Sequence, residues 1–342
     1  MKPNKEVTIH DLAAELNVAP STVSRALKEH PSISKETIQL VKKLAQERGY
    51  RPNQIAASLR NSKTNTIGVI ISLINRPFVS SLISGIEDTA RQEGYNVLIS
   101  QSHDSYDHEV ANAKALYNSR VSGLIVSLAT ETLQYDHFEE FFRSNIPVVF
   151  VDRVPEEVAS HRVIIDNFAA GFMATEHLIA QGCKRIAHFV GSQHRNVYKE
   201  RFRGYREALQ KHHLPIEEEL MISGNSLSLE EGTKLANQLF SLPNPPDGLF
   251  CPNDTTAISA IQCAKKRGIK VPEQLAIIGF NNDPISSIID PPLSTITHPA
   301  VEMGKIAAQQ LLKHSKHKEK FSHETVVLKT ELLVRESSLR TI

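Results

Sequence analysis

The chain has no tryptophan, and its 342 residues include only three cysteines. Because Cys183, Cys251 and Cys263 are odd in number and form no CxxC pair, the sequence lacks both a disulfide framework and a zinc-finger spacing. No run of about 18 apolar residues occurs that could span a membrane as a helix. The first residues, MKPNKEVTIHDL, lack the apolar segment of a secretory signal. These absences predict a cytoplasmic protein without membrane contact, in which the cysteines are small buried side chains.

Catalytic signatures are missing as well. No GxSxG, Walker, GxGxxG or HExxH motif occurs, so we predict no enzymatic activity, no cofactor and no catalytic residue. His103, Asp104, Asp107 and His108 are of the residue types that bind metals. A solvated loop is the simpler explanation of this cluster, because acidic side chains are mostly exposed in proteins. We therefore predict no metal site.

The chain does have the apolar content of a folded protein. Hydrophobic residues make up 40% of it, which excludes wholesale disorder, and its length predicts two or three domains. Charge is unevenly distributed. Residues 1–63 contain eleven Lys and Arg against six Asp and Glu, a net charge of +5, whereas the other 279 residues contain 28 and 32, a net charge of −4. A basic N-terminal part on an acidic body is typical of proteins that bind DNA phosphates.

Residues 8–28, TIHDLAAELNVAPSTVSRALK, have the pattern of two short helices joined by a tight turn. Apolar residues recur at helical spacing, Thr8 stands at an N-cap position, and Pro20 suits the first position of the second helix. The pattern predicts a helix-turn-helix whose second helix, from Pro20 to Lys28, reads DNA. An ordinary surface hairpin of helices is the alternative. A third amphipathic helix over 34–48 and the basic charge favour the DNA-binding interpretation.

Residues 52–65 are predicted to form a hinge. About eight of them can be helical, fewer than the roughly 12–15 at which an isolated helix becomes marginal in water, so the segment should fold only when it is held. A plain linker is the alternative. Leu59 stands among alanines with Arg60 and Lys63 beside it, which favours a segment that folds on DNA.

From Ile67 onward, short β-branched runs alternate with amphipathic helices, which predicts parallel sheets with crossover helices. The predicted strands are 67–72, 96–100, 123–126, 147–151 and 162–165 in one series, and 185–190, 248–251 and 275–279 in a second. The helices between them include 78–93, 168–181, 203–212, 229–240 and 255–267. We expect two doubly wound lobes, with the chain passing between them at Asn167. A helix over 301–313 and strands near 325–334 would return to the two lobes, which makes both discontinuous.

The predicted domains follow from these patterns. They are an all-α helix-turn-helix domain at 1–51, the hinge at 52–65 and an α/β core at 66–342. Within the core we assign about 66–166 and 298–324 to the first lobe, and about 167–297 and 325–342 to the second.

Polar side chains follow most of the predicted strands. In open α/β sheets ligands bind beyond the carboxyl ends of the strands. Carboxylates, amides and guanidinium groups beside one aromatic ring suit a polyhydroxylated or anionic small molecule. A helix cap or a salt bridge between the lobes is the alternative for each residue. The residues are Asn75, Phe78, Gln101, Asp104, Ser127, Asp152, Asp166, Arg195, Arg201, Asn253, Asp254, Asn281, Asn282 and Asp283.

Five segments occur in the order and spacing of a known family: VTIHDLAAELNVAPSTVSRALK, RGYRPNQIAASLR, TIGVII, IIGFNNDPIS and PPLSTITHP. Over essentially its full length the chain resembles the lactose-repressor/galactose-repressor (LacI/GalR) regulators. The resemblance implies a helix-turn-helix head, a hinge helix and a two-lobed body like periplasmic sugar-binding proteins. It also implies a transcriptional regulator, and we predict a repressor whose operator affinity is controlled by a sugar or sugar acid. The alternative is control by a phosphorylated carrier protein, and whether the effector releases or secures DNA stays open.

Position and resemblance together select the residues expected to contact DNA. Exposed side chains at the start of the second helix can reach base edges in the major groove, where Arg25 can bond a guanine twice; a phosphate contact is its alternative. Leu59 aligns with the family's leucine that wedges into the minor groove. Ala19 departs from the family, in which serine is common there and would cap the helix. The predicted contacts are Thr8, Pro20, Ser21, Thr22, Ser24, Arg25, Ser34, Tyr50, Asn53, Ala56 and Leu59, with Thr37 as a further phosphate contact.

The resemblance also narrows the effector site to Phe78, Asp152, Asp166, Arg195, Arg201, Asn253 and Asn281. Arg201 is the strongest candidate. Sugar-binding members commonly have aspartate where this chain has Asn281, and together with two arginines this favours an acidic sugar or another anion. Paired hinge helices imply a homodimer on a near-palindromic operator. No heptad repeat precedes Ile342, so we expect a dimer and not a tetramer.

Overall fold

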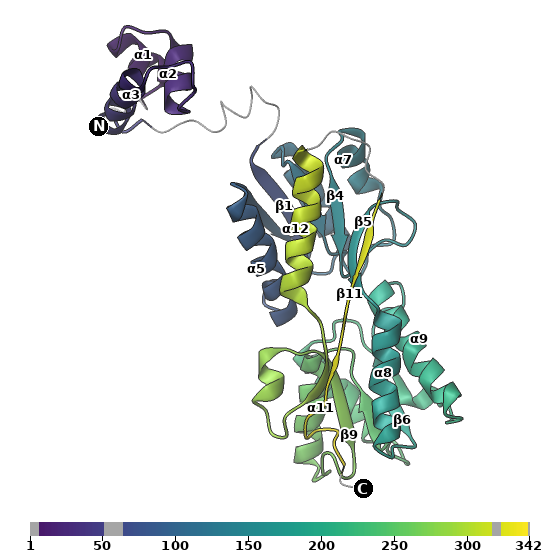
Figure 1. The fold of residues 1–342 in the computed structure, drawn as a ribbon. Helices are drawn as coiled ribbons and strands as arrows, with labels where there is room; N and C mark the ends of the chain where they lie inside the picture. Colours follow the sequence, from purple (N-terminus) through teal and green to yellow (C-terminus); the bar gives the residue numbers. More distant parts are fainter. Residues whose placement is uncertain (1–6, 51–63, 317–322, 341–342) are drawn as a thin grey trace, which may run out of the picture. The chain divides into compact units, whose positions relative to one another are not determined.

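The computed structural model describes residues 7–50, 64–316 and 323–340. The chain forms two compact units, Met1–Thr64 and Asn65–Ile342 (Figure 1). Most of the predicted hinge lies outside the described residues. The predicted DNA contacts Asn53, Ala56 and Leu59 lie outside them too.

The N-terminal unit contains the predicted helix-turn-helix. Its helices are α1 (Ile9–Glu15), α2 (Pro20–Leu27) and α3 (Lys35–Glu47). Asn17 adopts a left-handed conformation with φ 53°, as the tight turn between α1 and α2 requires. The three helices bury one shared core, formed by Leu12, Ala13, Val23, Ala26, Val41 and Ala45. Val23 and Ala26 thus form the buried face of α2, in keeping with the predicted helical spacing of apolar residues.

The first lobe of the core unit is built on a six-stranded sheet in the order β11-β5-β4-β3-β1-β2, in which every pairing is parallel. The strands are β1 (Thr66–Ile71), β2 (Asn96–Gln101), β3 (Gly123–Val126), β4 (Val148–Val151), β5 (His161–Ile165) and β11 (Thr325–Leu328). Because β11 pairs with β5, residues 325–328 belong to the first lobe. This corrects their assignment to the second lobe, which rested on chain order alone.

The second lobe is built on another six-stranded sheet, in the order β12-β10-β9-β8-β6-β7. Its strands are β6 (Ile186–Val190), β7 (Met221–Ser223), β8 (Gly248–Phe250), β9 (Ala276–Asn281), β10 (Ser294–Thr297) and β12 (Leu332–Leu333). The pairings are parallel except that β12 runs antiparallel to β10. β7 and β10 were not among the predicted strands, and β10 begins with two polar residues, Ser294 and Thr295. Their buried hydroxyls are satisfied by the Arg335 carbonyl and the Asp254 carboxylate.

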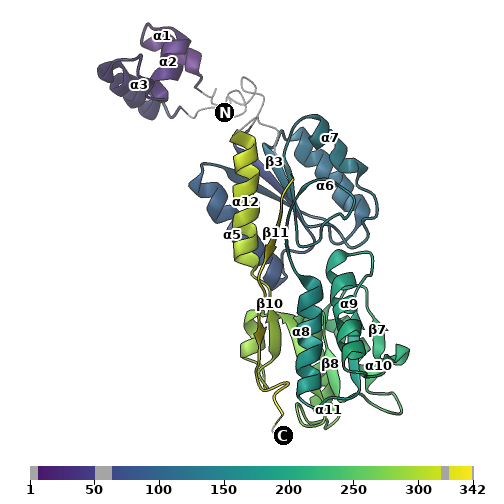
Figure 2. The ribbon, with the colours of Figure 1, turned by 45° about the vertical axis from the view of Figure 1, so that its right-hand side comes forward.

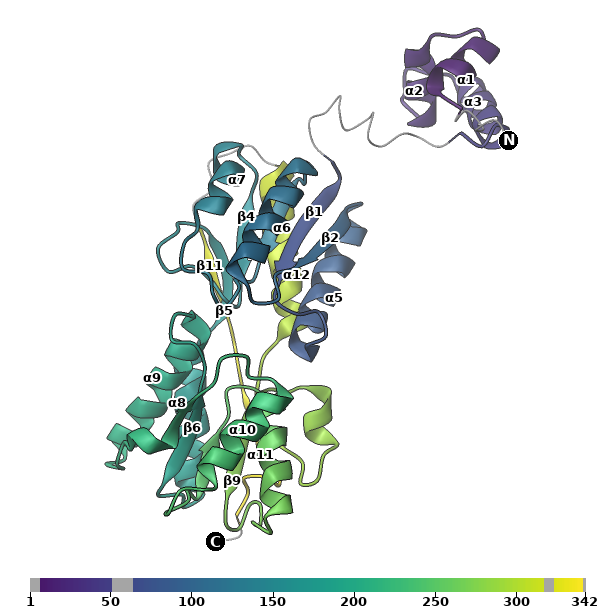
Figure 3. The ribbon, with the colours of Figure 1, turned by 180° about the vertical axis from the view of Figure 1, so that it is seen from behind.

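Helices cover both faces of each sheet, as a doubly wound fold requires (Figures 1 and 3). In the first lobe α5 (Pro77–Gln92) and α12 (Ala300–Lys316) pack on the side of Ile67 and Val69, while α6 (Tyr106–Asn118) and α7 (Glu139–Arg143) pack on the side of Ile70. In the second lobe α8 (Asn167–Ala180) and α9 (Asn196–Lys211) share one face, and α10 (Leu229–Leu239) and α11 (Asp254–Lys266) share the other. Figure 2 shows α8 beside α9. None of the helices in the described ranges combines the length and apolar character needed to cross a membrane.

The chain passes between the two lobes three times. These passages lie between β5 and α8, between β10 and α12, and between β11 and β12. Both lobes are therefore discontinuous, as predicted. The first passage ends at Asn167, the residue predicted from sequence.

Candidate DNA-binding and effector-binding sites

The α2 helix presents a polar surface at its N-terminal end. Pro20, Ser21 and Arg25 are exposed, and Thr22 and Ser24 are half-buried. Helical spacing places these side chains opposite Val23 and Ala26, which pack into the head. Ala19 provides no side-chain cap, and the helix nevertheless begins at Pro20, whose fixed φ suits the first helical position. The side chains that the sequence analysis expected to contact DNA are thus at least partly exposed at this end of α2.

Two of the predicted phosphate contacts serve as helix caps. Thr8 accepts a hydrogen bond from the Asp11 amide at 3.3 Å and donates one to the Asp11 carboxylate at 2.7 Å. Ser34 accepts from the Thr37 amide at 3.2 Å. Both caps remain exposed to solvent. Tyr50 is half-buried against the head core, and burial raises the pKa of its hydroxyl.

The core unit contains a cleft at the carboxyl ends of the strands of both lobes. Side chains that follow β1, β3 and β4 line it from the first lobe, and side chains that follow β8 and β9 line it from the second. The lining residues are Ser72, Arg76, Pro77, Phe78, Val79, Ser127, Asp152, Arg153, Val197, Tyr198, Arg201, Pro252, Asn253, Thr255, Asn281, Asp283 and His298. Five of the seven predicted effector residues are in this set: Phe78, Asp152, Arg201, Asn253 and Asn281.

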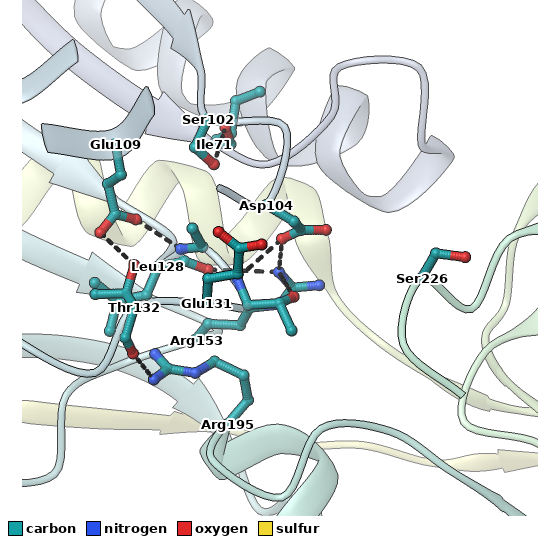
Figure 4. A network of polar contacts seen from close by, with 12 residues as sticks. Ile71, Ser102, Asp104, Glu109, Leu128, Glu131, Thr132, Arg153, Arg195 and Ser226 are labelled. Carbon is teal, nitrogen blue, oxygen red and sulfur yellow. Dashed lines mark hydrogen bonds and ion pairs between the residues drawn. The ribbon is translucent and has the colours of Figure 1, made fainter. Parts of the chain in front are cut away.

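The other two predicted effector residues, Asp166 and Arg195, do not line the cleft. Asp166 is the N-cap of α8 and accepts the Ala169 amide at 2.9 Å. Arg195 is buried and donates to the Thr132 carbonyl of the other lobe (Figure 4). Each therefore has the structural role that was the alternative at the sequence level: a helix cap for Asp166 and a contact between lobes for Arg195.

Close packing of α8 against α9 determines the position of Arg201. A Cβ atom on Gly204 would lie 2.3 Å from the Phe168 carbonyl oxygen, so only glycine allows this approach. Arg201 then donates from Nε to Asn167 at 2.8 Å and from one terminal nitrogen to the Pro252 carbonyl at 2.8 Å. Its guanidinium lies 3.5 Å from the centre of the Phe280 ring. Burial lowers the pKa of Arg201 to about 10, so the group stays cationic at neutral pH.

Asp152 follows β4 in a left-handed conformation, with φ 58°. A non-glycine residue in this region is strained, and such strain is often found at functional sites. Its carboxylate is buried, which raises its pKa. His298, which also lines the cleft, has its Nε2 3.5 Å from Asp152 Oδ1. The His298 ring stacks on Phe78 with 4.1 Å between the ring centres.

Arg153 forms hydrogen bonds with both lobes. Figure 4 shows its contact with Asp104 in the first lobe. Its guanidinium donates to the Asp104 carboxylate and to Thr130 in the first lobe, and to the Tyr198 hydroxyl in the second at 3.1 Å. Burial lowers the pKa of the Arg153 guanidinium. Tyr198 and the carboxylates of Asp104 and Asp152 have the opposite and larger effect, so the pKa is raised. Burial raises the pKa of Asp104, but the charges of Arg153 and Arg76 and the hydrogen bonds with Arg153 and Thr130 outweigh burial and lower it. Arg153 is thus a permanent cation in the cleft wall.

Asn253 lines the cleft and at the same time caps α11. Its side-chain oxygen accepts the Thr256 amide at 2.8 Å, and its nitrogen donates to the Leu227 carbonyl at 3.1 Å. The next residue, Asp254, accepts from Thr295 and from the Asp283 amide, and burial raises its pKa to about 7. Both amide atoms of Asn253 are engaged within the protein, so its main role in this structure is to shape the cleft.

The chain matches two known family models. Residues 8–53 match bacterial regulatory proteins of the lacI family, and residues 175–338 match the periplasmic binding protein-like domain. The HTH-type transcriptional repressor CytR of Escherichia coli (strain K12) is 35% identical over 91% of this chain and 92% of its own length. The HTH-type transcriptional regulator DegA of Bacillus subtilis (strain 168) is 33% identical over 97% of this chain and 98% of its own. The chain belongs to the lacI family.

Solved structures of lacI-family regulators have the same fold. The transcriptional regulator CelR in complex with cellobiose aligns with a TM-score of 0.72 at 27% identity, over 97% of this chain and 100% of that one. The Lac repressor bound to ONPG in the repressed state aligns with a TM-score of 0.85 at 25% identity, over 98% and 100%. The predicted fold class and family are confirmed. As a member of this family, the protein is a DNA-binding transcriptional regulator.

Arg153, Tyr198 and His298 are among the cleft residues that the sequence analysis of this lacI-family chain missed. Arg153 directly follows Asp152, so the signal that identified Asp152, its place after a predicted strand, applies to Arg153 as well. Tyr198 lies in the first turn of α9, which was predicted to begin only at residue 203 but begins at Asn196. His298 belongs to the PPLSTITHP segment and follows no predicted strand, so its position gave no signal of a site residue.

Proposed function

We propose that the protein is a repressor whose operator affinity is controlled by a sugar or sugar acid bound in the cleft. The main support is that Arg201 and Asp152 are both buried and both line one cleft. Arg201 forms no ion pair with any carboxylate in the described part of the chain, and its hydrogen bonds go to the neutral groups of Asn167 and Pro252. A carboxylate or hydroxyl group of an effector would complete its hydrogen bonding.

The relatives support the sugar class. CelR was solved with cellobiose, and another lacI-family regulator, from Enterococcus faecium, was solved with bound ribose. The cleft of this chain offers groups that can bind sugar hydroxyls, namely carboxylate, amide and guanidinium groups beside the Phe78 ring. Its two buried arginines extend the candidates to sugar acids.

A thermal-shift screen tests the effector. The panel is D-glucose, D-galactose, D-ribose, cellobiose, D-glucuronate and D-glucose 6-phosphate, each with the full chain. A ligand present at about 100 times its dissociation constant adds about 2.7 kcal/mol to the stability of the folded state. Stabilisation by one or more members supports the proposal. A flat response across the panel, together with tighter operator binding on addition of a phosphorylated sugar-uptake carrier protein, would favour the alternative regulator.

At the DNA, we propose that the exposed end of α2 enters the major groove and that two chains bind a near-palindromic operator. The support is the basic N-terminal unit and the exposure of Ser21 and Arg25 beside a buried Val23. Selection from a pool of random duplexes, followed by sequencing, tests this. Enrichment of an inverted repeat is expected, and enrichment of single half-sites only would contradict the dimer.

We further propose that the effector acts by changing the relation of the two lobes. Arg153–Tyr198, Arg195–Thr132 and Arg76–Ser226 are hydrogen bonds between the lobes. A ligand that binds both cleft walls shifts the balance between arrangements of the lobes by its differential affinity for them. A change of this kind needs only a few kcal/mol to alter operator binding.

A further inference from the structure

Two buried polar atoms in the cleft lack hydrogen-bond partners. They are Nε2 of His298, in the passage from β10 to α12, and Oδ1 of Asp152, directly after β4, and the two atoms lie 3.5 Å apart. His298 is 7% exposed and Asp152 is 9% exposed. Buried polar groups without partners are unfavourable, and they are rare in native proteins. Two such atoms facing one another at a cleft wall point to a ligand group that bonds both.

The orientation of the His298 ring is fixed by its surroundings. It stacks on Phe78 and meets the edge of Phe280, with ring centres 4.1 Å and 5.9 Å away. On the far side, Nδ1 lies 3.3 Å from the side-chain oxygen of Asn281. The ring therefore cannot turn Nε2 away from the cleft without losing these contacts.

The charge state of the pair selects the kind of group that fits. Burial and the positive charge of Arg201 hold the pKa of His298 well below its usual range, so the ring is neutral. The Asp152 carboxylate favours the tautomer with the proton on the facing nitrogen, Nε2. Nδ1 then accepts from the Asn281 amide, whose nitrogen and oxygen exchange places by a half-turn of the side chain. The cleft thus presents one donor and one acceptor side by side.

We propose that His298 is a specificity-determining residue of the effector site and that, together with Asp152, it binds one hydroxyl group of the effector. This rests on the proposed function of the cleft. The hydroxyl donates its proton to Oδ1 of Asp152 and accepts from Nε2 of His298. One oxygen can lie about 2.8 Å from two atoms separated by this distance, so the geometry allows both bonds. A carboxylate or an ether oxygen has no proton for Asp152, and an ammonium group cannot accept from Nε2.

His298 and Asp152 would distinguish the effector from analogues that lack the hydroxyl group, because such analogues leave both side chains without a hydrogen-bond partner. An analogue that lacks the hydroxyl buries both polar atoms without partners, so its binding is penalised more than the loss of one ordinary contact implies. The effector class is therefore a polyhydroxy compound whose recognition depends on one particular hydroxyl. Arg201 lies in the same cleft and remains available for another group of the molecule.

The test uses the full chain and the strongest binder found among D-glucose, D-galactose, D-ribose, cellobiose and D-glucuronate. Its monodeoxy analogues are titrated by calorimetry against the wild type, His298→Phe and His298→Gln. Phenylalanine keeps the ring on Phe78 and removes the N–H group, whereas glutamine keeps a donor. His188→Phe is the matched control, because His188 is also a buried neutral ring stacked on aromatic neighbours, outside the cleft.

One monodeoxy analogue should bind the wild type about ten- to a hundredfold more weakly than the parent sugar, the others much less so. His298→Phe should bind the parent sugar weakly and no longer distinguish that analogue, while His298→Gln and His188→Phe should still distinguish it. Operator affinity without sugar serves as the folding check.

Two outcomes would contradict the role of His298 but leave the proposed sugar-binding function of the cleft intact. Either His298→Phe binds the parent sugar as the wild type does, or all monodeoxy analogues lose affinity equally. If no sugar of the panel binds the wild type, the proposed effector class fails and the role of His298 fails with it. If His298→Phe does not fold, the wild-type deoxy series together with His298→Gln decides, because equal losses for every analogue would still contradict the pair.

Discussion

A guanidinium group that is buried without a carboxylate partner depends on every neutral acceptor around it. Arg201 has two such acceptors, the Asn167 side chain and the Pro252 carbonyl, and an aromatic face in Phe280. Asn167 starts α8 and Pro252 precedes α11, so this one side chain ties three helices together at the floor of the cleft. A residue proposed to hold the effector is thus also part of the scaffold.

We expect Arg201→Lys to lower the free energy of unfolding by about 1–3 kcal/mol, because lysine cannot bond both acceptors and leaves one of them buried without a donor. Urea unfolding followed by circular dichroism measures the change. Arg203→Lys is the control on the same helix, since Arg203 is exposed and pairs with Glu200 at the surface. Its effect should stay within about 0.5 kcal/mol. Equal losses in the two variants would show that the buried contacts of Arg201 do not matter for stability.

Arg25 is exposed on α2, so removing its side chain should leave the head folded. We expect Arg25→Ala to lower discrimination at one base pair of the operator by about 1–3 kcal/mol, because a bidentate contact to guanine would be lost. Fluorescence anisotropy with single-base operator variants measures this. Lys28→Ala removes the same charge beyond the last turn of α2 and should weaken binding to all variants alike. If Arg25→Ala also weakens all variants equally, Arg25 contacts phosphate and not a base.

Three elements meet at the amino-terminal edge of the first sheet, away from the cleft. His161 begins β5, His314 lies near the end of α12, and His323 precedes β11. The His161 ring centre is 4.2 Å from that of His314 and 5.8 Å from that of His323, and the Glu324 amide donates to its Nδ1 at 3.3 Å. Burial, the two histidines and Lys313 together lower the pKa of His161 from 6.5 to about 4. The surroundings of His161 thus favour its neutral imidazole form.

Protonation of His161 at acid pH should lower the free energy of unfolding. Between pH 6.5 and pH 4 the unfolded chain binds more protons at His161 than the folded chain does, so this stabilisation is complete above pH 6.5 and is lost as the pH falls toward 4. We expect the wild type to lose about 1 kcal/mol more than His161→Gln between pH 7 and pH 5, measured by urea unfolding at both pH values. His212→Gln, at an exposed histidine, should behave as the wild type does. An identical pH dependence of wild type and His161→Gln would contradict the assignment.

At the scale of the whole molecule, charge is divided between two units that the structure separates at Thr64. The basic N-terminal unit is suited to phosphates, and the acidic remainder repels them. In the core, two sheets present the carboxyl ends of their strands to one cleft, where the buried ionisable groups of both lobes gather. DNA binding and effector binding should therefore respond differently to ionic strength.

We expect the logarithm of operator affinity to fall linearly with the logarithm of salt concentration, with a slope of about −0.9 for each phosphate neutralised. Affinity for a neutral sugar should barely change over the same range, because its bonds are formed inside a buried cleft. Fluorescence anisotropy measures the operator affinity and calorimetry measures the sugar affinity. Both are recorded between roughly 50 and 200 mM salt, the range over which DNA affinity falls steeply. Operator binding that is insensitive to salt would contradict the phosphate contacts.

Patterns among residues close in sequence were sufficient to predict most of the helices and strands and part of the site. The capping box at Thr8, Pro20 at the start of α2, and the alternation of β-branched runs with helices all act between residues close in sequence, and they identified the head and the two lobes. Phe78, Asp152, Arg201, Asn253 and Asn281 were found because each follows or closely precedes a recognisable strand or helix, and because the family resemblance points to them.

Contacts between distant segments decided the rest. β11 joins the first sheet because its edge pairs with β5, a partner more than 150 residues earlier, and no local pattern records that pairing. Asp166 and Arg195 resemble site residues in the sequence, but a helix cap and a carbonyl of the other lobe engage them. His298 became part of the cleft only where the passage from β10 to α12 brings its ring against Phe78 and opposite Asp152. Hydrogen bonds and burial of this kind depend on which strands and helices meet, and that is a property of the folded chain.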